Sequence, residues 1–285
     1  MRISRERVVH PQESLRCLHL ELNAFRAGLH RHGHAELTWI ERGQGLRWVG
    51  DSVEPFFDGD LVLLGRDVVH TWASRGEDRP GGCHATVLQF PAEWARRTGL
   101  PELSGVAPLM LQARRGLHLQ GATRDAAVSL LLRIRAAVGA RRVGAFVELL
   151  GVLLEGQADL RPLACDTGPG EGGTDRAARR IDPVLAWVEN HLGEELRVEQ
   201  AAALAHVTPA AFARFFRREV GKGFIEYLND ARCSWAALCL MESRAPVSQI
   251  AQECGFAALS NFGEQFRRRY GVSPRDFRKA SGREQ

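Results

Sequence analysis

The chain has 285 residues, 45% of them hydrophobic and 25% charged. These values exclude a disordered or fibrous protein, and the length allows about two domains, each with its own core. The formal net charge of +4 is too small for a protein that compacts DNA non-specifically through charge alone.

Residues of about 20–95 are predicted to form an antiparallel β-barrel or sandwich. From Glu36 to Phe90, short runs with alternating apolar residues, such as LRWVG and VEPFF, are separated by glycine and aspartate. Short alternating runs with turn residues between them are typical of antiparallel strands. The first part of the chain is therefore expected to be a small β-domain.

Histidines and a glutamate concentrate in this predicted barrel. His30, His32 and Glu36 share one parity within a run, and His70 follows a later run. Alternate residues of a strand point the same way, so these groups can converge inside a barrel. Three imidazoles and a carboxylate would suit Zn, Fe, Mn or Ni. The same residues could instead line a polar ligand pocket, or be buried histidines whose hydrogen bonds are satisfied.

The spacing of these residues resembles the two motifs of the cupin fold, over residues of about 28–74. The first motif, HxHx3Ex6G, matches His30, His32, Glu36 and Gly43. In the second motif, Gly65 and Asp67 replace the usual Pro and Gly, and Ser74 replaces Asn. The resemblance implies a barrel that binds an effector, and the candidate effector-binding residues are His30, His32, Glu36, Thr38, His70 and Trp72. Trp72 could stack on a sugar ring or an aromatic acid, or simply pack in the core.

Two helices are predicted after the barrel, within residues of about 121–158. The stretches 123–138 and 143–157 carry apolar residues at the spacing of one helix face. This face either packs against the barrel or pairs with a second copy of the chain. Asp166–Gly173 is polar and glycine-rich, so residues 161–180 are predicted to be a flexible linker.

From residue 181 onward the pattern is all helical and contains an internal repeat. The segment VEQAAALAHVTPAAFARFFRREVG (198–221) resembles PVSQIAQECGFAALSNFGEQFRRRYG (246–271). Each contains a short alanine-rich helix, a turn, and a longer helix with a phenylalanine face. In the first unit, Thr208 caps the longer helix and Pro209 begins it. The repeat predicts two helix-turn-helix units.

Arginines lie on the helix face opposite the phenylalanines, as Arg214, Arg217 and Arg218 do in the first unit. A short helix with a buried aromatic face and exposed guanidinium groups suits a DNA major groove. The helix 225–241 joins the units. A rigid connector must hold them about one DNA turn apart, ~34–36 Å, if both are to reach one duplex face. The alternative is a helical bundle with solvated arginines, and two matching capped units favour DNA binding.

Residues 181–280 resemble the C-terminal DNA-binding domain of AraC/XylS-family transcriptional regulators. Besides the two repeats, the segments GFIEYLNDAR and FRRRYGVSPRDFR carry the resemblance. It implies base contacts from Ala210, Ala213, Arg214, Ser260, Gly263 and Glu264, and phosphate contacts from Arg217 and Arg267. Thr208, Arg218, Asn261 and Arg268 are further candidates for DNA contacts. Many regulators of this layout use the cupin barrel as an effector pocket, frequently without a metal.

Three positions of the repeats depart from the family pattern. Ala213, Gly263 and Glu264 stand where the family more often has polar or basic residues. An alanine can still contact a thymine methyl group, and a glutamate can accept a hydrogen bond from cytosine N4. Glu264 could equally repel a phosphate and weaken that half-site.

Together these patterns predict an α+β protein of two domains. Residues 1–160 would form a cupin-like effector-binding and dimerisation domain, and residues 181–285 a double helix-turn-helix domain. The expected function is sequence-specific, effector-dependent transcription regulation and not catalysis. The expected partners are promoter DNA, a small molecule, RNA polymerase and a second copy of the chain, with a divalent metal as an open alternative. No segment reads as a membrane span or a signal peptide, so a cytoplasmic location is expected.

The competing function is that of a metal-dependent cupin enzyme, of dioxygenase or isomerase type, with a helical accessory domain. It would use the same histidines and Glu36 as metal ligands. The second cupin motif is incomplete, whereas the helical repeat spans the whole second domain. The sequence therefore favours the regulator.

Overall fold

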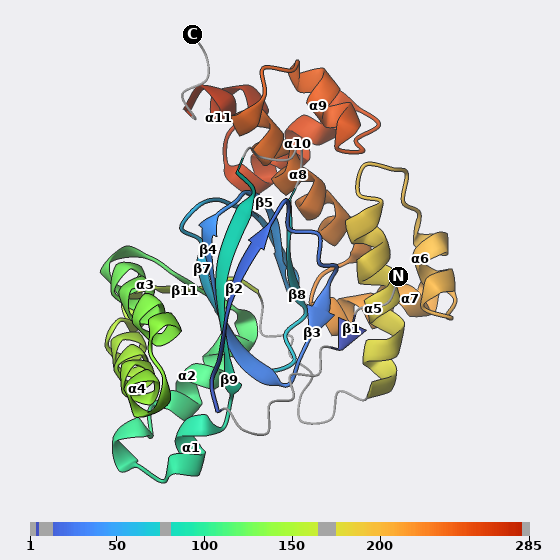
Figure 1. Ribbon diagram of the computed structural model, residues 1–285. Helices are drawn as coiled ribbons and strands as arrows, with labels where there is room; N and C mark the ends of the chain where they lie inside the picture. Colours follow the sequence, from blue (N-terminus) through green and yellow to red (C-terminus); the bar gives the residue numbers. More distant parts are fainter. Residues whose placement is uncertain (1–3, 6–13, 75–80, 165–174, 281–285) are drawn as a thin grey trace.

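The computed structural model describes residues 4–5, 14–74, 81–164 and 175–280. It consists of a β-domain followed by a helical domain (Figure 1). The predicted α+β architecture is therefore confirmed. Within the described residues, no helix is long and apolar enough to span a bilayer.

Two β-sheets form the core of the first domain. The five-stranded sheet has the order β1 (Ser4–Arg5), β3 (His30–Arg31), β8 (His70–Ser74), β5 (Gly45–Val49) and β6 (Ser52–Phe56). The six-stranded sheet has the order β11 (Leu160–Pro162), β10 (Leu117–Leu119), β7 (Leu61–Leu64), β4 (His34–Arg42), β9 (Cys83–Pro91) and β2 (Arg16–Leu22). All pairs are antiparallel except β1 with β3. Among these pairs, β5 and β6 are joined by a short turn, and most of the other paired strands are distant in sequence.

Helices cover the outer face of the six-stranded sheet (Figure 1). They are α1 (Trp94–Thr98), α2 (Val106–Gln112), α3 (Gly121–Ala136) and α4 (Gly139–Glu155). Phe146 of α4 packs against Phe90 and Trp94, with ring centroids 4.9 Å apart in both pairs. The apolar stripe that the sequence left open between the barrel and a second copy is therefore buried against the sheet.

The second domain begins earlier than expected. Residues 161–180 were predicted to be a linker, but β11 includes 161 and 162 and α5 (Asp175–Asn190) starts at 175. Apolar side chains of α5 such as Val184 and Val188 are fully buried, which is the packing that holds this helix in place. Residues 165–174, with most of the glycine-rich stretch, lie outside the described residues.

The internal repeat forms two helix pairs around a long central helix. The first pair is α6 (Val198–Leu204) and α7 (Pro209–Val220), and the second is α9 (Val247–Glu253) and α10 (Leu259–Tyr270). They flank α8 (Phe224–Glu242), and α11 (Pro274–Ala280) ends the domain. Each long helix of a pair stops at a left-handed glycine, Gly221 or Gly271.

The turns of the two pairs have the same backbone conformation. Gly255 has φ +83°, and His206 takes the equivalent place with φ +54°. In each turn the next residue donates its N–H to a carbonyl five residues back, from Val207 to Ala202 and from Phe256 to Ala251. The repeat seen in the sequence is therefore a repeat of structure.

The helical domain covers the outer face of the five-stranded sheet. Leu46, Trp48 and Val53 of β5 and β6 are fully buried in one apolar cluster with residues of α5, α7 and α8. Figure 1 shows α8 lying along this edge of the β-domain. The two domains thus share an apolar core.

Candidate functional site

The first candidate site is the exposed face of α7. Phe212, Phe215 and Phe216 are buried on its inner face. Thr208 accepts a hydrogen bond from the Ala211 N–H at 3.4 Å and caps the helix start. The residues predicted to contact DNA from this unit are all exposed: Thr208, Ala210, Ala213, Arg214, Arg217 and Arg218. The arrangement leaves a basic face free to meet a duplex.

The second unit repeats this arrangement on α10. Phe262 and Phe266 are fully buried on its inner face. Of the residues predicted to contact DNA here, Gly263 is half-buried and the others are exposed, namely Ser260, Asn261, Glu264, Arg267 and Arg268. Both helices thus present small or polar side chains near their starts and arginines near their ends. Arginines at such positions match phosphates on either side of a groove.

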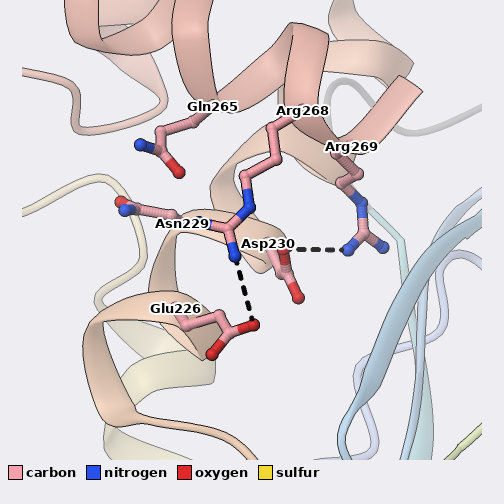
Figure 2. A pocket seen from close by; sticks show the side chains of 6 residues that line it. All are labelled: Glu226, Asn229, Asp230, Gln265, Arg268 and Arg269. Carbon is pink, nitrogen blue, oxygen red and sulfur yellow. Dashed lines mark ion pairs between the residues drawn. The ribbon is translucent and has the colours of Figure 1, made fainter. Parts of the chain in front are cut away.

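The last arginines of α10 differ in their surroundings. A polar cleft of about 200 Å³ lies between α8 and α10 (Figure 2). It is lined by Glu226, Asn229, Asp230, Gln265, Arg268 and Arg269. Arg268 is exposed and has its Nη2 3.8 Å from Glu226 Oε1, whereas Arg269 is half-buried and has its Nη1 3.2 Å from Asp230 Oδ1. Of the run Arg267–Arg269, only the first two side chains are therefore available to DNA.

The second candidate site is a histidine cluster inside the β-domain. Ring nitrogens of His30, His32 and His70 lie within 4.8 Å of one another. Each Nδ1 is close to a backbone carbonyl oxygen, those of Gly28, His34 and Val68 at 3.1, 3.1 and 2.9 Å. A carbonyl oxygen only accepts, so Nδ1 carries the proton in each ring. In a neutral ring the Nε2 lone pair is then left for the cluster.

Glu36 lies among these rings and is buried. Its carboxylate is 2.9 Å from His32 Nε2 and 3.6 Å from His70 Nε2. Thr38 Oγ1 and Gln89 Nε2 donate to it at 2.6 and 3.0 Å. Burial raises the pKa of Glu36, but His32, at hydrogen-bond distance, and the nearby His70 lower it well below the usual value. The cluster therefore holds a carboxylate that is charged at neutral pH.

One ring of the cluster is neutral, and one ring nitrogen has no hydrogen-bond partner. Burial, and then the nearby His70, lowers the pKa of His30 to about 4, so this ring is neutral. His70 Nε2 is buried without a hydrogen-bond partner. Three imidazole nitrogens and one carboxylate form a donor set that transition metals bind in proteins. Rings oriented by Nδ1–H bonds to carbonyls are also typical of metal sites. The residues present thus fit a divalent cation.

Trp72 is occupied by contacts within the domain. Its Nε1 donates to Asp60 Oδ2 at 2.9 Å, and its ring meets the edge of His70 at a centroid distance of 6.0 Å. The indole is buried in the apolar cluster between the sheets. The geometry is that of core packing, which was one of the two sequence interpretations of this residue.

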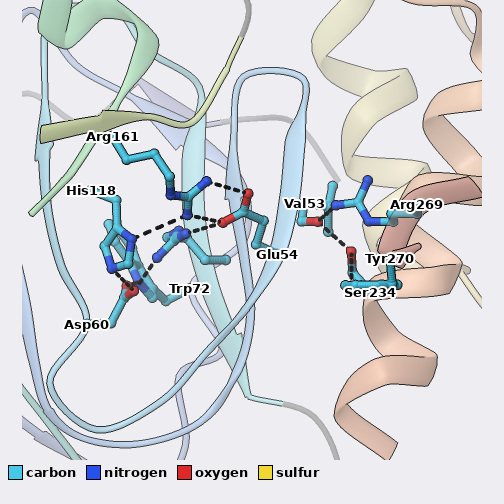
Figure 3. Close-up of polar contacts among 10 residues, drawn as sticks. Val53, Glu54, Asp60, Trp72, His118, Arg161, Ser234, Arg269 and Tyr270 are labelled. Carbon is cyan, nitrogen blue, oxygen red and sulfur yellow. Dashed lines mark hydrogen bonds and ion pairs between the residues drawn. The ribbon is translucent and has the colours of Figure 1, made fainter. Parts of the chain in front are cut away.

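Sequence reasoning missed a second polar network in the barrel (Figure 3). Arg47 is buried and donates to Asp60 and, at 2.8 Å, to Glu54. Arg161 also binds Glu54, at 2.7 Å, and His118 Nε2 is 3.4 Å from Asp60 Oδ1. Burial raises the pKa of Glu54, but the two arginines lower it below the usual value. The only signal in the sequence was the placement of Arg47 and Glu54 among apolar strand residues.

Comparisons with known proteins match both parts of the chain. The family model for the AraC-like ligand binding domain matches residues 14–135, and a helix-turn-helix domain model matches residues 201–280. The regulatory protein PocR of Salmonella typhimurium is 25% identical over 261 residues, which cover 81% of this chain and 86% of that protein. The chain belongs to the AraC family of transcriptional regulators. It is a DNA-binding transcription regulator with a ligand-binding domain before its helix-turn-helix units.

Other relatives align over most of the chain or over about a third of it. The transcriptional activator RhaS of Salmonella arizonae is 26% identical over 88% of this chain and 87% of that protein. The probable transcriptional regulator LumQ of Photobacterium leiognathi is 31% identical over 35% of this chain, and this match spans 41% of that protein. Among solved structures, the DNA-binding domain of AdpA with a target DNA is 34% identical, covering 38% of this chain and 93% of that one (TM-score 0.34).

Proposed function

We propose that the chain binds a bipartite promoter sequence through the exposed faces of α7 and α10. The observation that carries this is the repeated geometry of the two units, each with a buried phenylalanine face and an exposed face ending in arginines. Arg214 lies in the first unit where a guanidinium can bind guanine O6 and N7. Arg217 lies three residues after Arg214 on α7, and Arg267 lies three residues after Glu264 on α10. These two arginines would bind phosphates.

A selection experiment tests this proposal. The full chain is incubated with randomised duplexes, and bound duplexes are enriched and sequenced. The expected product contains two conserved blocks about one DNA turn apart. Enrichment of no sequence, with or without candidate small molecules, would contradict the proposed interface.

We further propose that the histidine cluster is the ligand site of the barrel and that it takes a divalent transition metal. The orphaned His70 Nε2 beside the charged Glu36 favours a cation over an apolar ligand. His30, His32, Glu36 and His70 would hold the metal, and Thr38 and Gln89 would orient the carboxylate. A bound metal would supply an electrostatic anchor for an oxygen-rich effector such as a sugar or an aromatic acid.

A regulatory role for this site differs from catalysis in its consequences. In the proposed function, metal or effector binding changes DNA affinity because it has different affinities for two arrangements of the chain. In a cupin enzyme, the same site would turn over a substrate whether or not DNA is present. We favour the regulator because the aligned relatives are transcriptional regulators. We also propose a homodimer and contact with RNA polymerase, since paired copies bind two operator sites together.

A further inference from the structure

The β5–β6 hairpin of the barrel contacts the helical domain where its two units meet. The Trp48 ring lies 6.1 Å from that of Tyr227 on α8, and Tyr227 lies 5.6 Å from Phe216 on α7. On the neighbouring strand, the Val53 carbonyl oxygen accepts from Ser234 Oγ and from Arg269 Nη2, both at 2.5 Å (Figure 3). The hairpin thus contacts the central helix and the second unit directly, and it reaches the first unit through Tyr227.

Four charged side chains of alternating sign connect the same three parts. Asp51 is in the hairpin turn, Lys222 links α7 to α8, and Asp230 and Arg269 are on α8 and α10. Lys222 Nζ is 3.4 Å from Asp51 Oδ2 and 2.9 Å from Asp230 Oδ2. Arg269 completes this series of ion pairs, since its Nη1 lies 3.2 Å from Asp230 Oδ1. Asp51 is buried, so these pairs are screened by solvent far less than surface pairs.

This contact lies away from the recognition faces. Residues of α7 and α10 that were predicted to meet DNA are exposed, apart from the half-buried Gly263. Arg269 instead lies half-buried beside α8 (Figure 2). The barrel therefore does not cover the DNA-binding surface. It can act on DNA binding by setting where the two helices lie relative to one another.

The opposite face of the hairpin carries side chains of the barrel interior. Strand residues alternate between faces, so Trp48 and Val53 point to the helical domain while Arg47 and Glu54 point inward. Arg47 lies opposite Trp72, and Val49 lies opposite His70, in the register of β5 with β8. A change at the histidine cluster or in the Arg47 network acts on the same strands that hold the helices.

We propose that the β5–β6 hairpin is a clamp that sets the separation of the two recognition helices, and that Arg269 is the positioning residue through which it holds α10. This proposal rests on the DNA interface proposed above. Release of the clamp leaves each unit folded around its own phenylalanines but frees the units to move relative to one another. A duplex with both half-sites then loses the advantage of preorganised binding, whereas a single half-site does not.

The test uses the full chain and two duplexes. One is a bipartite duplex selected from the randomised pool by the unaltered chain, and the other is the same duplex with one block replaced by unrelated sequence. Arg269→Gln removes the clamp contact on α10, and Asp51→Asn removes the contact that the hairpin turn makes with Lys222. Arg244→Gln is the control for Arg269→Gln. Arg244 is exposed in the same domain, and its replacement removes one positive charge, as Arg269→Gln does.

Each clamp variant is expected to bind the bipartite duplex about tenfold more weakly and the half-site duplex within about twofold of the unaltered chain. The double variant is expected to resemble either single variant, since both break one network. Arg244→Gln is expected to change both duplexes equally and slightly. Equal losses on the two duplexes from Arg269→Gln and Asp51→Asn, or no loss on either, would overturn the clamp. Failure of the unaltered chain to select any duplex would instead overturn the DNA interface on which it rests.

Discussion

His30 and His70 lie directly opposite each other on paired strands β3 and β8, with ring centroids 4.3 Å apart. Two protonated rings at this distance would repel, and His70 contributes to lowering the pKa of His30 to about 4. Both Nδ1 atoms are held by backbone carbonyls, and the Nε2 of His70 lies 3.6 Å from the charged Glu36. A cation bound by this pair of histidines would also balance the negative charge of Glu36.

Metal binding at the cluster should stabilise the β-domain. Chelator-treated protein is titrated with Zn²⁺ or Ni²⁺, and the free energy of unfolding is measured by urea denaturation. A metal at about 100 times its Kd should add about 2.7 kcal/mol. His70→Gln should abolish this gain, whereas His84→Gln, on β9 outside the cluster, should retain it. An equal gain in both variants would place the metal elsewhere.

The histidine cluster was predicted from the motif spacing, but the reason given for it, one strand with a shared parity, is wrong. His30 lies on β3 and Glu36 on β4, which belong to different sheets, and His32 lies between the two strands. The Arg47 network could not be predicted in the same way. Its acidic partners come from other strands, and which residues face each other depends on the register of the folded sheets.

The interface between the domains should be a large part of the stability of the chain. Trp48→Ala removes a fully buried indole from the cluster shared by β5, β6 and α8. A loss of about 3–5 kcal/mol is expected from such a truncation. Because the cluster joins the domains, the variant should unfold in two resolved transitions where the unaltered chain unfolds in one.

A second tryptophan provides the control for this effect. Trp94→Ala truncates a half-buried ring that packs on Phe146, on the far side of the β-domain. It should lower stability without separating the transitions. If both variants unfold in one step with similar losses, the interface does not couple the domains. Scanning calorimetry shows whether each variant unfolds in one transition or in two.

The two helix-turn-helix units were predictable, and their attachment to the barrel was not. Caps such as Thr208 and stops such as Gly221 are local signals, and their repetition indicated two units. Trp48 and Val53 carry no comparable signal. A buried strand residue gives the same apolar sequence pattern whether another sheet or a helix packs on it. The bounds of the predicted linker were wrong at its second end, since α5 already begins at residue 175.

Arg214 should contribute to both affinity and sequence preference. Arg214→Ala should weaken binding to the selected duplex by about 1–3 kcal/mol and relax the preference at one or two base pairs. Arg217→Ala should weaken all duplexes alike and reduce the dependence of affinity on salt. Both residues are exposed, so the unfolding free energy should change little. Identical effects of the two variants on sequence preference would contradict the separation into base and phosphate contacts.

His118 should make the chain less stable in mild acid. Burial, and then the charge of Arg47, lowers its pKa to about 4 from an ordinary value of 6.5. The unfolded chain therefore takes up a proton between pH 6.5 and 4 while the folded chain does not, so stability falls over this window as the pH decreases. A shift of this size corresponds to about 3 kcal/mol. His118→Gln should reduce the loss between pH 7 and pH 4 by about this amount, measured by urea unfolding at each pH. Between pH 7 and 9, above the window, the two stability curves should run parallel, and a divergence there would assign the effect to another group.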